Sequence, residues 1–162
     1  MKTNDNLAAA FAGESQARNK YTFFAEQAEK EGHKSAAHLF RAAAEAETIH
    51  ARNEFKLNGG IGSTADNLKA ANAGETFEYT EMYPKMIEDA KAEGNKQAEM
   101  IFGGACAAEQ VHADLYNDAL ANLGKDDDQE YYVCPICGYI HKGKPEGPCP
   151  ICKAKAEMFK KF

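Results

Sequence analysis

The sequence has no tryptophan and only five prolines among its 162 residues. Four of these prolines lie in residues 131–162, so the first 124 residues hold a single one, Pro84. That stretch is rich in alanine, glutamate, lysine and methionine, and this composition favours helices. No apolar run is long enough to cross a membrane, so we expect no membrane association. The first residues lack the pattern of a signal peptide, so we expect a cytoplasmic protein.

An excess of positive charge is also missing. The formal net charge is -6, with 25 acidic residues against 19 basic ones. Proteins that bind phosphate backbones usually present a basic face, so we expect no nucleic-acid partner. Part of the acidic excess should be neutralised by bound cations.

Glycines divide the first 124 residues into helical segments. Gly32, Gly94, Gly124 and the pair Gly59-Gly60 each follow a long helical run, which is where a stop signal is expected. The segments predicted to be helical are 3–30, 34–57, 65–92 and 95–123. Pro84 lies inside the third segment, where we expect a kink or a local bulge.

The helical region reads as a duplicated hairpin. Ala-Gly-Glu occurs at 12–14 and 73–75, and Glu-x-x-His occurs at 47–50 and 109–112. The first motif recurs after 61 residues and the second after 62, so the offset is nearly constant over a whole hairpin. Each hairpin therefore supplies a glutamate from its first helix and a glutamate and a histidine from its second.

Acidic residues interrupt the apolar stripe of every predicted helix. They are Glu14, Glu47, Glu75 with Glu78, and Glu109. Burying a carboxylate is unfavourable without a cation, and no lysine or arginine shares these stripes. Five glutamates that converge with His50 and His112 therefore predict a two-metal site inside a four-helix bundle. Oxygen-rich ligands with imidazole favour iron or manganese over zinc.

Four residues close to these motifs are open to more than one interpretation. Tyr21 and Tyr83 lie on the ligand faces, where they either hydrogen-bond ligand carboxylates or pack as core aromatics. Glu54 lies one turn after His50, and we expect an exposed carboxylate at the end of its hairpin. Cys106 is interpreted as a small buried thiol, with a reactive thiol as the alternative.

Residues 131–162 differ from the rest in composition. They contain four of the five cysteines in two C-x-x-C pairs, Cys134, Cys137, Cys149 and Cys152. A segment this short needs a staple, so we expect a β-rich knuckle held by metal. Four thiolates suit zinc or a single iron, and Gly138-Tyr139 after the second cysteine favours iron. The predicted domains are residues 1–124, a linker at 125–130, and residues 131–162.

Together these motifs resemble the rubrerythrin family. The resemblance rests on NLAAAFAGESQARNKY, the Glu-x-x-His pairs, AGETFEYTEMYP and CPICGY…CPIC, and it covers nearly the whole chain. It implies a mainly α protein, with a ferritin-like four-helix bundle followed by a small rubredoxin-like domain. The implied function is that of a non-haem di-iron peroxidase, which reduces hydrogen peroxide to water in oxidative-stress defence. Electrons would be relayed through a rubredoxin-type iron centre held by four cysteines.

The resemblance also implies roles for single residues. The di-iron ligands would be Glu14, Glu47, His50, Glu75, Glu78, Glu109 and His112, with Glu47 and Glu109 bridging. Glu78 and His50 would exchange as ligands when the site is reduced, and Tyr21 and Tyr83 fall on tyrosines near the family's ligands. The implied cofactors are two irons in the helical site and one in the four-cysteine site, where zinc can enter on recombinant expression. The implied electron donor is an NAD(P)H-dependent reductase or a rubredoxin.

The connection between the second and third helical segments is short for such a bundle. Glu75 follows His50 by only 25 residues. In a ferritin-like bundle these two helices run parallel, so their connection must cover about 25–30 Å along the axis. Residues 58–64 reach at most about 25 Å when fully extended. We therefore expect a homodimer with exchanged hairpins, and an up-down-up-down bundle of one chain is the alternative.

Two other functions remain as alternatives. A ferroxidase or iron-handling protein would use the same carboxylates, but iron storage needs no thiolate electron relay. A non-redox protein with zinc in both sites would be colourless, whereas ferric thiolate iron is red.

Overall fold

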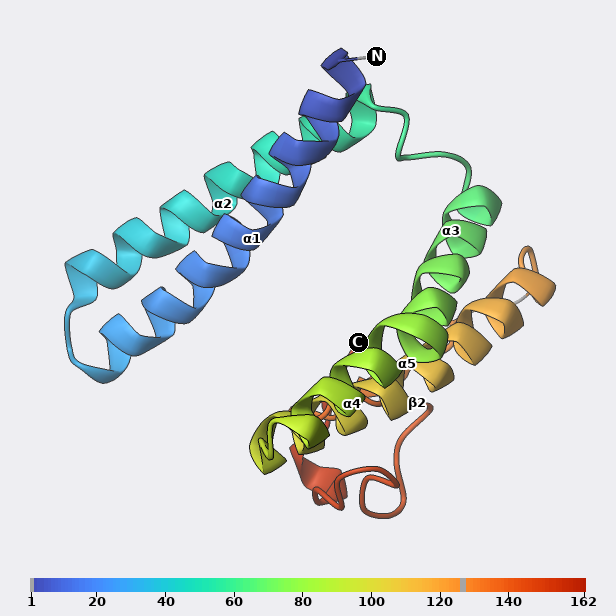
Figure 1. Ribbon diagram of the computed structural model, residues 1–162. Coiled ribbons are helices and arrows are strands. Elements are labelled where there is room, and N and C mark those ends of the chain that lie inside the picture. Colours follow the sequence, from blue (N-terminus) through green and yellow to red (C-terminus); the bar gives the residue numbers. More distant parts are fainter. Residues whose placement is uncertain (1, 126–127) are drawn as a thin grey trace. The chain divides into compact units, whose positions relative to one another are not determined.

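The computed structural model of the protein describes residues 2–125 and 128–162 (Figure 1). The helical elements are α1 (Lys2–Lys30), α2 (Lys34–Leu57), α3 (Thr64–Phe77), the π-helical turn η1 (Glu78–Met82), α4 (Tyr83–Ala92) and α5 (Lys96–Ala121). They are followed by β1 (Tyr131–Val133), β2 (Ile140–Lys142), the 3-10 turn η2 (Ala156–Met158) and β3 (Lys160–Lys161). The predicted mainly helical fold with a small cysteine-containing domain is confirmed. Among the described residues, no helix is both long and apolar enough to span a bilayer.

The chain folds into two compact units, Met1–Gly62 and Ser63–Phe162, and each is described by itself. The first is a hairpin in which α1 and α2 pack along each other. In the second, α3, η1 and α4 pack in succession along α5, and β2 also contacts α5. The division into residues 1–124, a linker at 125–130 and a module at 131–162 stays a prediction. Residues 126 and 127 of that linker lie outside the described part of the chain.

Equivalent glycines form the turns of the two hairpins. Gly32 and Gly94 have φ angles of +80° and +69°, which glycine adopts without steric cost. In both turns, the N–H after the glycine bonds the carbonyl four residues before the glycine, at 2.8 Å and 2.9 Å. These bonds form the same capping motif, so the predicted stop signals are confirmed at both positions and the duplication extends to the turns.

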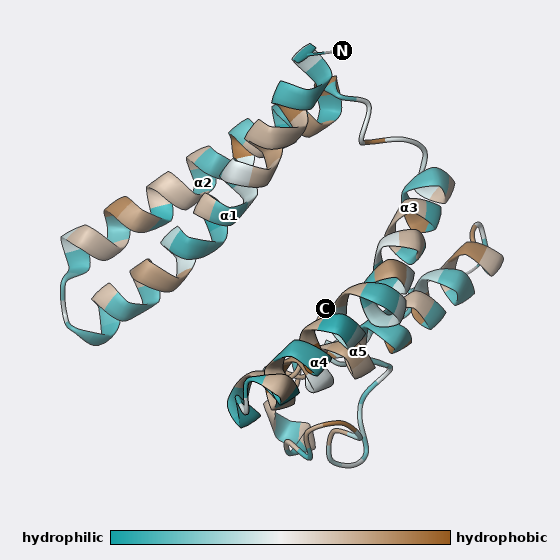
Figure 2. Cartoon of the chain, in the orientation of Figure 1, coloured by the Kyte–Doolittle hydropathy of each residue, from teal (hydrophilic) through white to brown (hydrophobic). Residues whose placement is uncertain are grey.

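Alanines fill the interfaces inside both helical units. Among the described residues, the buried apolar side chains of the five helices are Ala25, Ala28, Ala37, Ala44, Ala51, Ala90, Ala108 and Ala113. Larger side chains stay at least partly exposed, as Phe24 at 48 % and Phe77 at 51 % illustrate. Figure 2 shows hydrophobic segments recurring along both hairpins. Because alanine buries little apolar area, each helical unit has only a thin core of its own.

Pro84 produces the local bulge that the sequence predicted. The turn η1 lies directly before it, and the N–H of Tyr83 bonds the carbonyl of Glu78, five residues back. The carbonyl of Tyr79 therefore loses its α-helical donor, and Pro84 has no N–H to replace it. The thiol of Cys106 on α5 donates to this carbonyl, with 3.6 Å from sulfur to oxygen. Cys106 thus holds the bulge against α5, and it is partly exposed rather than buried as expected.

Three short strands, in the order β2-β1-β3, form the antiparallel sheet of the terminal module. Val133 pairs with Ile140 on one side and with Lys160 on the other. The buried core of the module is Cys134, Cys149 and Phe159. Two cysteines are thus the largest fully buried side chains in the described part of the chain. A core of this size is too small to stabilise the module without a further constraint such as a bound metal.

Candidate metal centres

The first hairpin brings three predicted ligands together. Ligand atoms of Glu14 on α1 and of Glu47 and His50 on α2 lie within 4.8 Å of one another. His50 Nδ1 is 2.9 Å from Glu47 Oε2 and 3.9 Å from Glu14 Oε1. Glu47 and His50 share a helix face because residues three apart in a helix are neighbours.

The second hairpin repeats this geometry. Glu75 on α3 and Glu109 and His112 on α5 also place ligand atoms within 4.8 Å of one another. His112 Nδ1 is 2.6 Å from Glu109 Oε2 and 3.8 Å from Glu75 Oε1. The near-equal distances in the two copies follow from the repeated Glu-x-x-His spacing. Each unit therefore gathers three of the seven predicted ligands into one cluster.

The carboxylates of each half-site disturb one another's ionisation. The pKa of Glu14 is raised, chiefly by its hydrogen bond to Glu47 and then by desolvation. The pKa of Glu75 is raised, chiefly by burial and then by the charge of Glu109. Like charges at this distance disfavour full ionisation. A bound metal ion would offset this repulsion.

Glu78 lies beside the second half-site but outside its tight cluster. It is carried by η1, and its pKa is raised, first by burial and then by Glu75. The three ligand atoms that approach within 4.8 Å come from other residues. The role of Glu78 as an exchanging ligand stays a prediction.

The two tyrosines differ in their surroundings. The pKa of Tyr83 is raised, first by burial and then by Glu109 and other nearby carboxylates, so its hydroxyl lies in the field of the second half-site. Tyr21 packs its ring 6.3 Å from Phe24 and 6.4 Å from Phe40. In the described residues no hydrogen bond joins the Tyr21 hydroxyl to a ligand carboxylate. The role of both tyrosines near the ligands stays a prediction.

Sequence reasoning missed one residue in each half-site. Glu54 was expected to be exposed, but its Oε2 atom is buried and has no hydrogen-bond partner. Tyr116 has its pKa raised, first by burial and then by Glu75 and Glu109. Both residues follow the histidine of their hairpin by four positions, and this shared spacing is the signal that could have identified them.

The four paired cysteines of the module surround a single point. Their sulfur atoms all lie within 4.8 Å of one another, with 3.5 Å from Cys134 to Cys152 and 3.6 Å from Cys137 to Cys149. A metal about 2.3 Å from each thiolate requires sulfur separations of this order. All five cysteines of the chain are free thiols. The module therefore has the geometry of a tetrahedral four-cysteine site.

Burial and backbone donors set the ionisation of these thiols. Burial raises the pKa of Cys137. Burial also acts to raise the pKa of Cys149. Hydrogen bonds from the backbone N–H groups of Cys152 and Ile151 outweigh this effect and lower the pKa to about 7. Backbone N–H groups aimed at sulfur stabilise thiolates, the form that binds metal.

Two family models match the chain, rubrerythrin at residues 5–120 and the rubredoxin-like domain of rubrerythrin at residues 132–160. The chain belongs to the rubrerythrin family. It is 39 % identical to nigerythrin of Nitratidesulfovibrio vulgaris, over 97 % of this chain and 85 % of the relative. It is 38 % identical to rubrerythrin-1 of Clostridium acetobutylicum, over 93 % of this chain and 89 % of the relative. The solved structure of fully reduced, all-ferrous nigerythrin aligns with a TM-score of 0.62 at 39 % identity, covering 99 % of this chain and 86 % of that chain.

Membership of the rubrerythrin family confirms the predicted cofactors, a di-iron site and a rubredoxin-like iron site with four cysteine ligands. The residues present fit both groups. The helical clusters offer carboxylate oxygens and imidazole nitrogens, which suit a carboxylate-bridged iron pair. The buried oxygen of Glu54 has no hydrogen-bond partner, and a cation would satisfy it. Four thiolates suit the single iron of a rubredoxin-like site.

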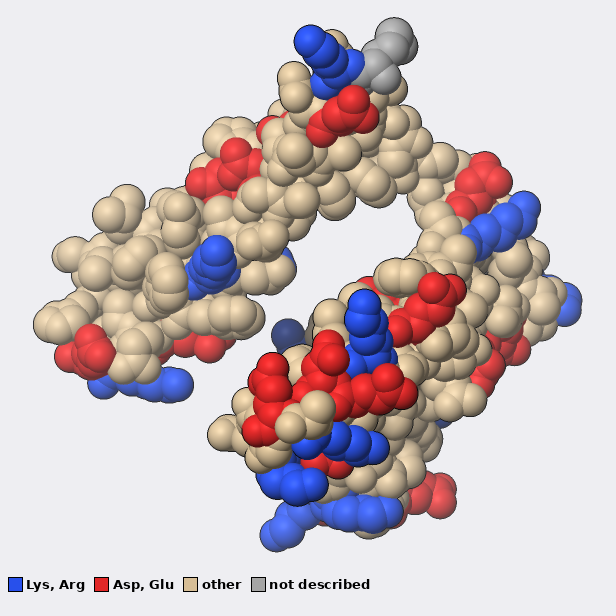
Figure 3. All heavy atoms as spheres, in the orientation of Figure 1, with Lys and Arg blue, Asp and Glu red and all other residues tan. Residues whose placement is uncertain are grey.

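In this rubrerythrin-family chain, the module packs against the helix that carries the second half-site. His112 Nε2 lies 3.0 Å from the carbonyl oxygen of Gly138, directly after Cys137. Because Nε2 must donate this bond, the contact leaves His112 Nδ1 free to face a metal. Lys142 on β2 also pairs with Asp118 on α5. On the face shown in Figure 3, acidic and basic side chains are interspersed over this unit.

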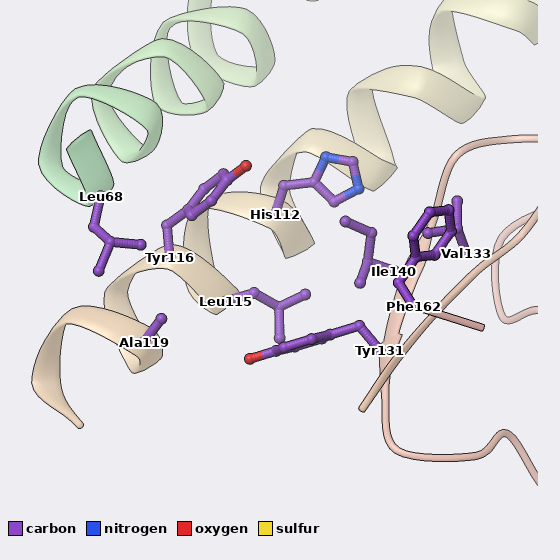
Figure 4. Close-up of a pocket in the computed structure, with 9 residues that line it drawn as sticks. All are labelled: Leu68, His112, Leu115, Tyr116, Ala119, Tyr131, Val133, Ile140 and Phe162. Carbon is purple, nitrogen blue, oxygen red and sulfur yellow. The ribbon is translucent and has the colours of Figure 1, made fainter. Parts of the chain in front are cut away.

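An apolar pocket of about 440 Å³ adjoins His112 inside the second unit (Figure 4). Leu68 comes from α3, and Leu115, Tyr116 and Ala119 come from α5. The module closes the other side with Tyr131, Val133, Ile140 and Phe162. His112, which bonds Gly138, thus also lines an apolar pocket.

Proposed function

We propose that the protein reduces hydrogen peroxide to water in defence against oxidative stress, with electrons arriving through the four-cysteine centre. Family membership supports an oxidoreductase. The observation that carries the finer proposal is the contact between His112 and Gly138. It links a ligand of the helical site to the loop beside Cys137, a thiolate of the four-cysteine site. Iron storage does not require such a link, so the contact favours the peroxidase over the ferroxidase.

Reduction of one peroxide to two waters consumes two electrons and two protons. Bound iron in the helical site would supply these two electrons, and iron bound by the four cysteines would supply their replacement. The proposed ligands of the pair are Glu14, Glu47, His50, Glu75, Glu78, Glu109 and His112, with Glu47 and Glu109 bridging. The thiolate-bound iron is held by Cys134, Cys137, Cys149 and Cys152.

Tyr83 is the proposed hydrogen-bond donor beside the second half-site. Its pKa is raised, first by burial and then by Glu109, which further favours the protonated hydroxyl. A protonated phenol could donate a hydrogen bond to an oxygen of peroxide that enters the site. Tyr21 occupies the matching place in the first copy, 62 residues earlier, and is proposed for the same role.

Glu78 and His50 are the proposed exchanging ligands. Support comes from the π-helical turn on which Glu78 lies, since such turns are frequent at functional sites and interrupt the regular helical ladder. His50 is 55 % exposed at its side chain, so its ring has room to turn. Both properties suit a pair of side chains that would bind the same metal alternately.

The proposal includes a homodimer with exchanged helical hairpins. Three features support it: each hairpin holds only half of the ligand cluster, each has a thin alanine core, and few residues connect α2 to α3. Lengthening the connection should test this. Insertion of about eight Gly/Ser residues after Ile61 should allow one chain to form a complete site and shift the protein toward monomer in analytical ultracentrifugation, with iron retained. A dimer that persists unchanged after the insertion would favour a different association.

The proposed electron donor is an NAD(P)H-dependent reductase or a rubredoxin. Ile136, next to Cys137, is 63 % exposed and offers an apolar contact close to the four-cysteine site. We propose a cytoplasmic location because free thiols persist in reducing surroundings.

The test is to mix the fully reduced protein, with about three irons per chain, with equimolar hydrogen peroxide in the absence of air. We expect the visible absorption of ferric thiolate iron to appear as peroxide is consumed. Glu109→Ala should lose the helical iron but keep the thiolate iron, which peroxide should then oxidise slowly. Glu88→Ala, an exposed position on α4, is the matched control. If peroxide oxidised wild-type iron no faster than air does, the ferroxidase alternative would replace the proposal.

A further inference from the structure

Glu54 has a buried carboxylate oxygen without a hydrogen-bond partner. It lies on α2, four residues after His50 and seven after Glu47, so helical spacing puts all three on one face. Its Oε2 atom is buried without a hydrogen-bond partner, and among the described residues it is the only side-chain nitrogen or oxygen in that state. No lysine, arginine or histidine of the described chain forms an ion pair with it.

Glu54 lies near the first half-site but outside the three residues whose ligand atoms come within 4.8 Å of one another. Its charge acts on the carboxyl of Glu14, which itself lies 3.9 Å from His50. An ionised oxygen without a donor or a cation is unfavourable when buried. A metal ion held by the neighbouring carboxylates and imidazole would supply the missing positive charge.

The two copies of the hairpin show why a further ligand belongs here. At the position that matches Glu54, the second copy has Tyr116, and at the position that matches Glu78 the first copy has Ala17. The first hairpin therefore holds Glu14, Glu47, Glu54 and His50, and the second holds Glu75, Glu78, Glu109 and His112. Each copy has three carboxylates and one imidazole, but the additional carboxylate comes from a different helix in each.

We propose that Glu54 is a further carboxylate ligand of the metal ion held by α1 and α2. The ion would be a divalent cation that accepts oxygen and imidazole donors, such as ferrous iron, manganese or cobalt. With Glu54, each hairpin supplies three carboxylates and one imidazole to the metal pair. The proposal rests on the metal pair of the proposed function and is independent of peroxide reduction.

Cobalt binding to the full-length, metal-free protein tests the proposal. Zinc is first loaded into the four cysteines, which hold it tightly, so that cobalt reports only the carboxylate sites. Cobalt is then titrated by calorimetry and visible absorption into the wild type, Glu54→Gln and Glu54→Leu. Glu45→Gln is the matched control, since Glu45 is an exposed glutamate on the same helix.

We expect Glu54→Gln to weaken one of the two cobalt sites by about tenfold or more and to leave the other unchanged. Glu45→Gln should bind as the wild type does. Metal-free Glu54→Leu should melt at a higher temperature than the metal-free wild type, because an unpaired buried oxygen is gone, but cobalt should raise its melting temperature less.

Unchanged affinity at both sites in Glu54→Gln, or equal loss at both, would overturn the assignment. Glu54→Gln keeps the shape of the side chain, so it remains informative if Glu54→Leu fails to fold. Peroxide turnover is measured separately. Two cobalt sites with the expected response to Glu54→Gln, in a protein without peroxidase activity, would refute the proposed function and leave the ligand assignment standing.

Discussion

The two hairpins carry the same ligand motif in different surroundings. Glu47 and Glu109 are almost equally exposed, at 18 % and 16 % of their side chains. His50 is 55 % exposed, whereas His112 is 14 % exposed and bonds Gly138 of the cysteine module. The comparison teaches that helical spacing reproduces the ligand geometry, while the packing around it decides which half-site is connected to the second metal centre.

The copies also differ in the regularity of their first helices. The helix of the first copy is continuous over Lys2–Lys30, whereas the matching stretch of the second is interrupted by η1. Glu78 lies on that turn, and the thiol of Cys106 fastens it. The first copy has Ala44 at the position that matches Cys106. The second copy thus departs from the first where it carries its additional carboxylate.

The largest effect should come from separating the module from α5. A Cβ added at Gly104 would lie 3.8 Å from the Cβ of Cys137, so the longer side chain of Gly104→Leu would push the knuckle away from His112. We expect electron transfer from the thiolate-bound iron to slow roughly 10- to 100-fold, with unchanged iron content. Stopped-flow absorption of the reduced protein measures this rate.

Gly103→Leu is the control for that substitution. Gly103 is the preceding residue on α5, and a Cβ there meets nothing within 4 Å. Both variants gain the same helical propensity. Equal slowing in the two variants would show that the contact between α5 and Cys137 does not carry the effect.

Removal of the thiol that fastens the π-helical turn should have the next largest effect. Cys106→Ala leaves the Tyr79 carbonyl without its donor, and we expect the free energy of unfolding to fall by about 1–3 kcal/mol. Cys106→Ser keeps a donor and should lose less. Urea unfolding of the metal-free proteins gives these values. Equal stability of the alanine and serine variants would mean that the hydrogen bond contributes nothing.

The charge of Glu75 should make metal-free stability depend on pH. Its pKa is raised, first by burial and then by Glu109, above the ordinary value of 4.5. The protonated carboxyl therefore stabilises the fold below pH 4.5, and this contribution is lost as pH rises through the raised pKa. We expect metal-free Glu75→Gln to exceed the wild type in stability at about pH 7 and to match it below the ordinary pKa. Thermal unfolding with chelator across this range checks the sign, and a constant difference at every pH would contradict it.

The smallest effect concerns the two cysteine turns of the module, which follow Cys134 and Cys149. The N–H groups of Gly138 and Lys153 bond the carbonyls of Cys134 and Cys149, at 3.1 Å and 3.0 Å. Lys153 has a φ of 63°, the only such non-glycine residue in the described chain. We expect Lys153→Gly to relieve strain and to stabilise the module by about 1 kcal/mol. Lys155→Gly, where the backbone is extended, should destabilise it slightly. Hydrogen exchange of the module measures both, and stabilisation by both variants would argue against strain at Lys153.

Much of the fold and of the site followed from local patterns. The glycine stops at Gly32 and Gly94, the bulge before Pro84 and the clustering of each Glu-x-x-His pair with its glutamate depend on residues close in sequence or on a repeat. The burial of Glu54 did not follow, because a residue one helical turn after a ligand can face either solvent or a neighbouring helix. The interaction of Cys106 with Tyr79 was equally hidden, since it depends on which carbonyl the bulge leaves unbonded.

The sequence by itself predicted the residues that the structure gathers into three clusters able to hold a metal. The spacing within each Glu-x-x-His motif and each C-x-x-C pair positions its ligands, because helix and knuckle geometry is set by residues a few positions apart. Only the tertiary structure decided that His112 meets Gly138, 26 residues away, and that Glu54 turns its oxygen inward. Such contacts depend on how separate elements pack, and packing is a property of many side chains together that no single spacing encodes.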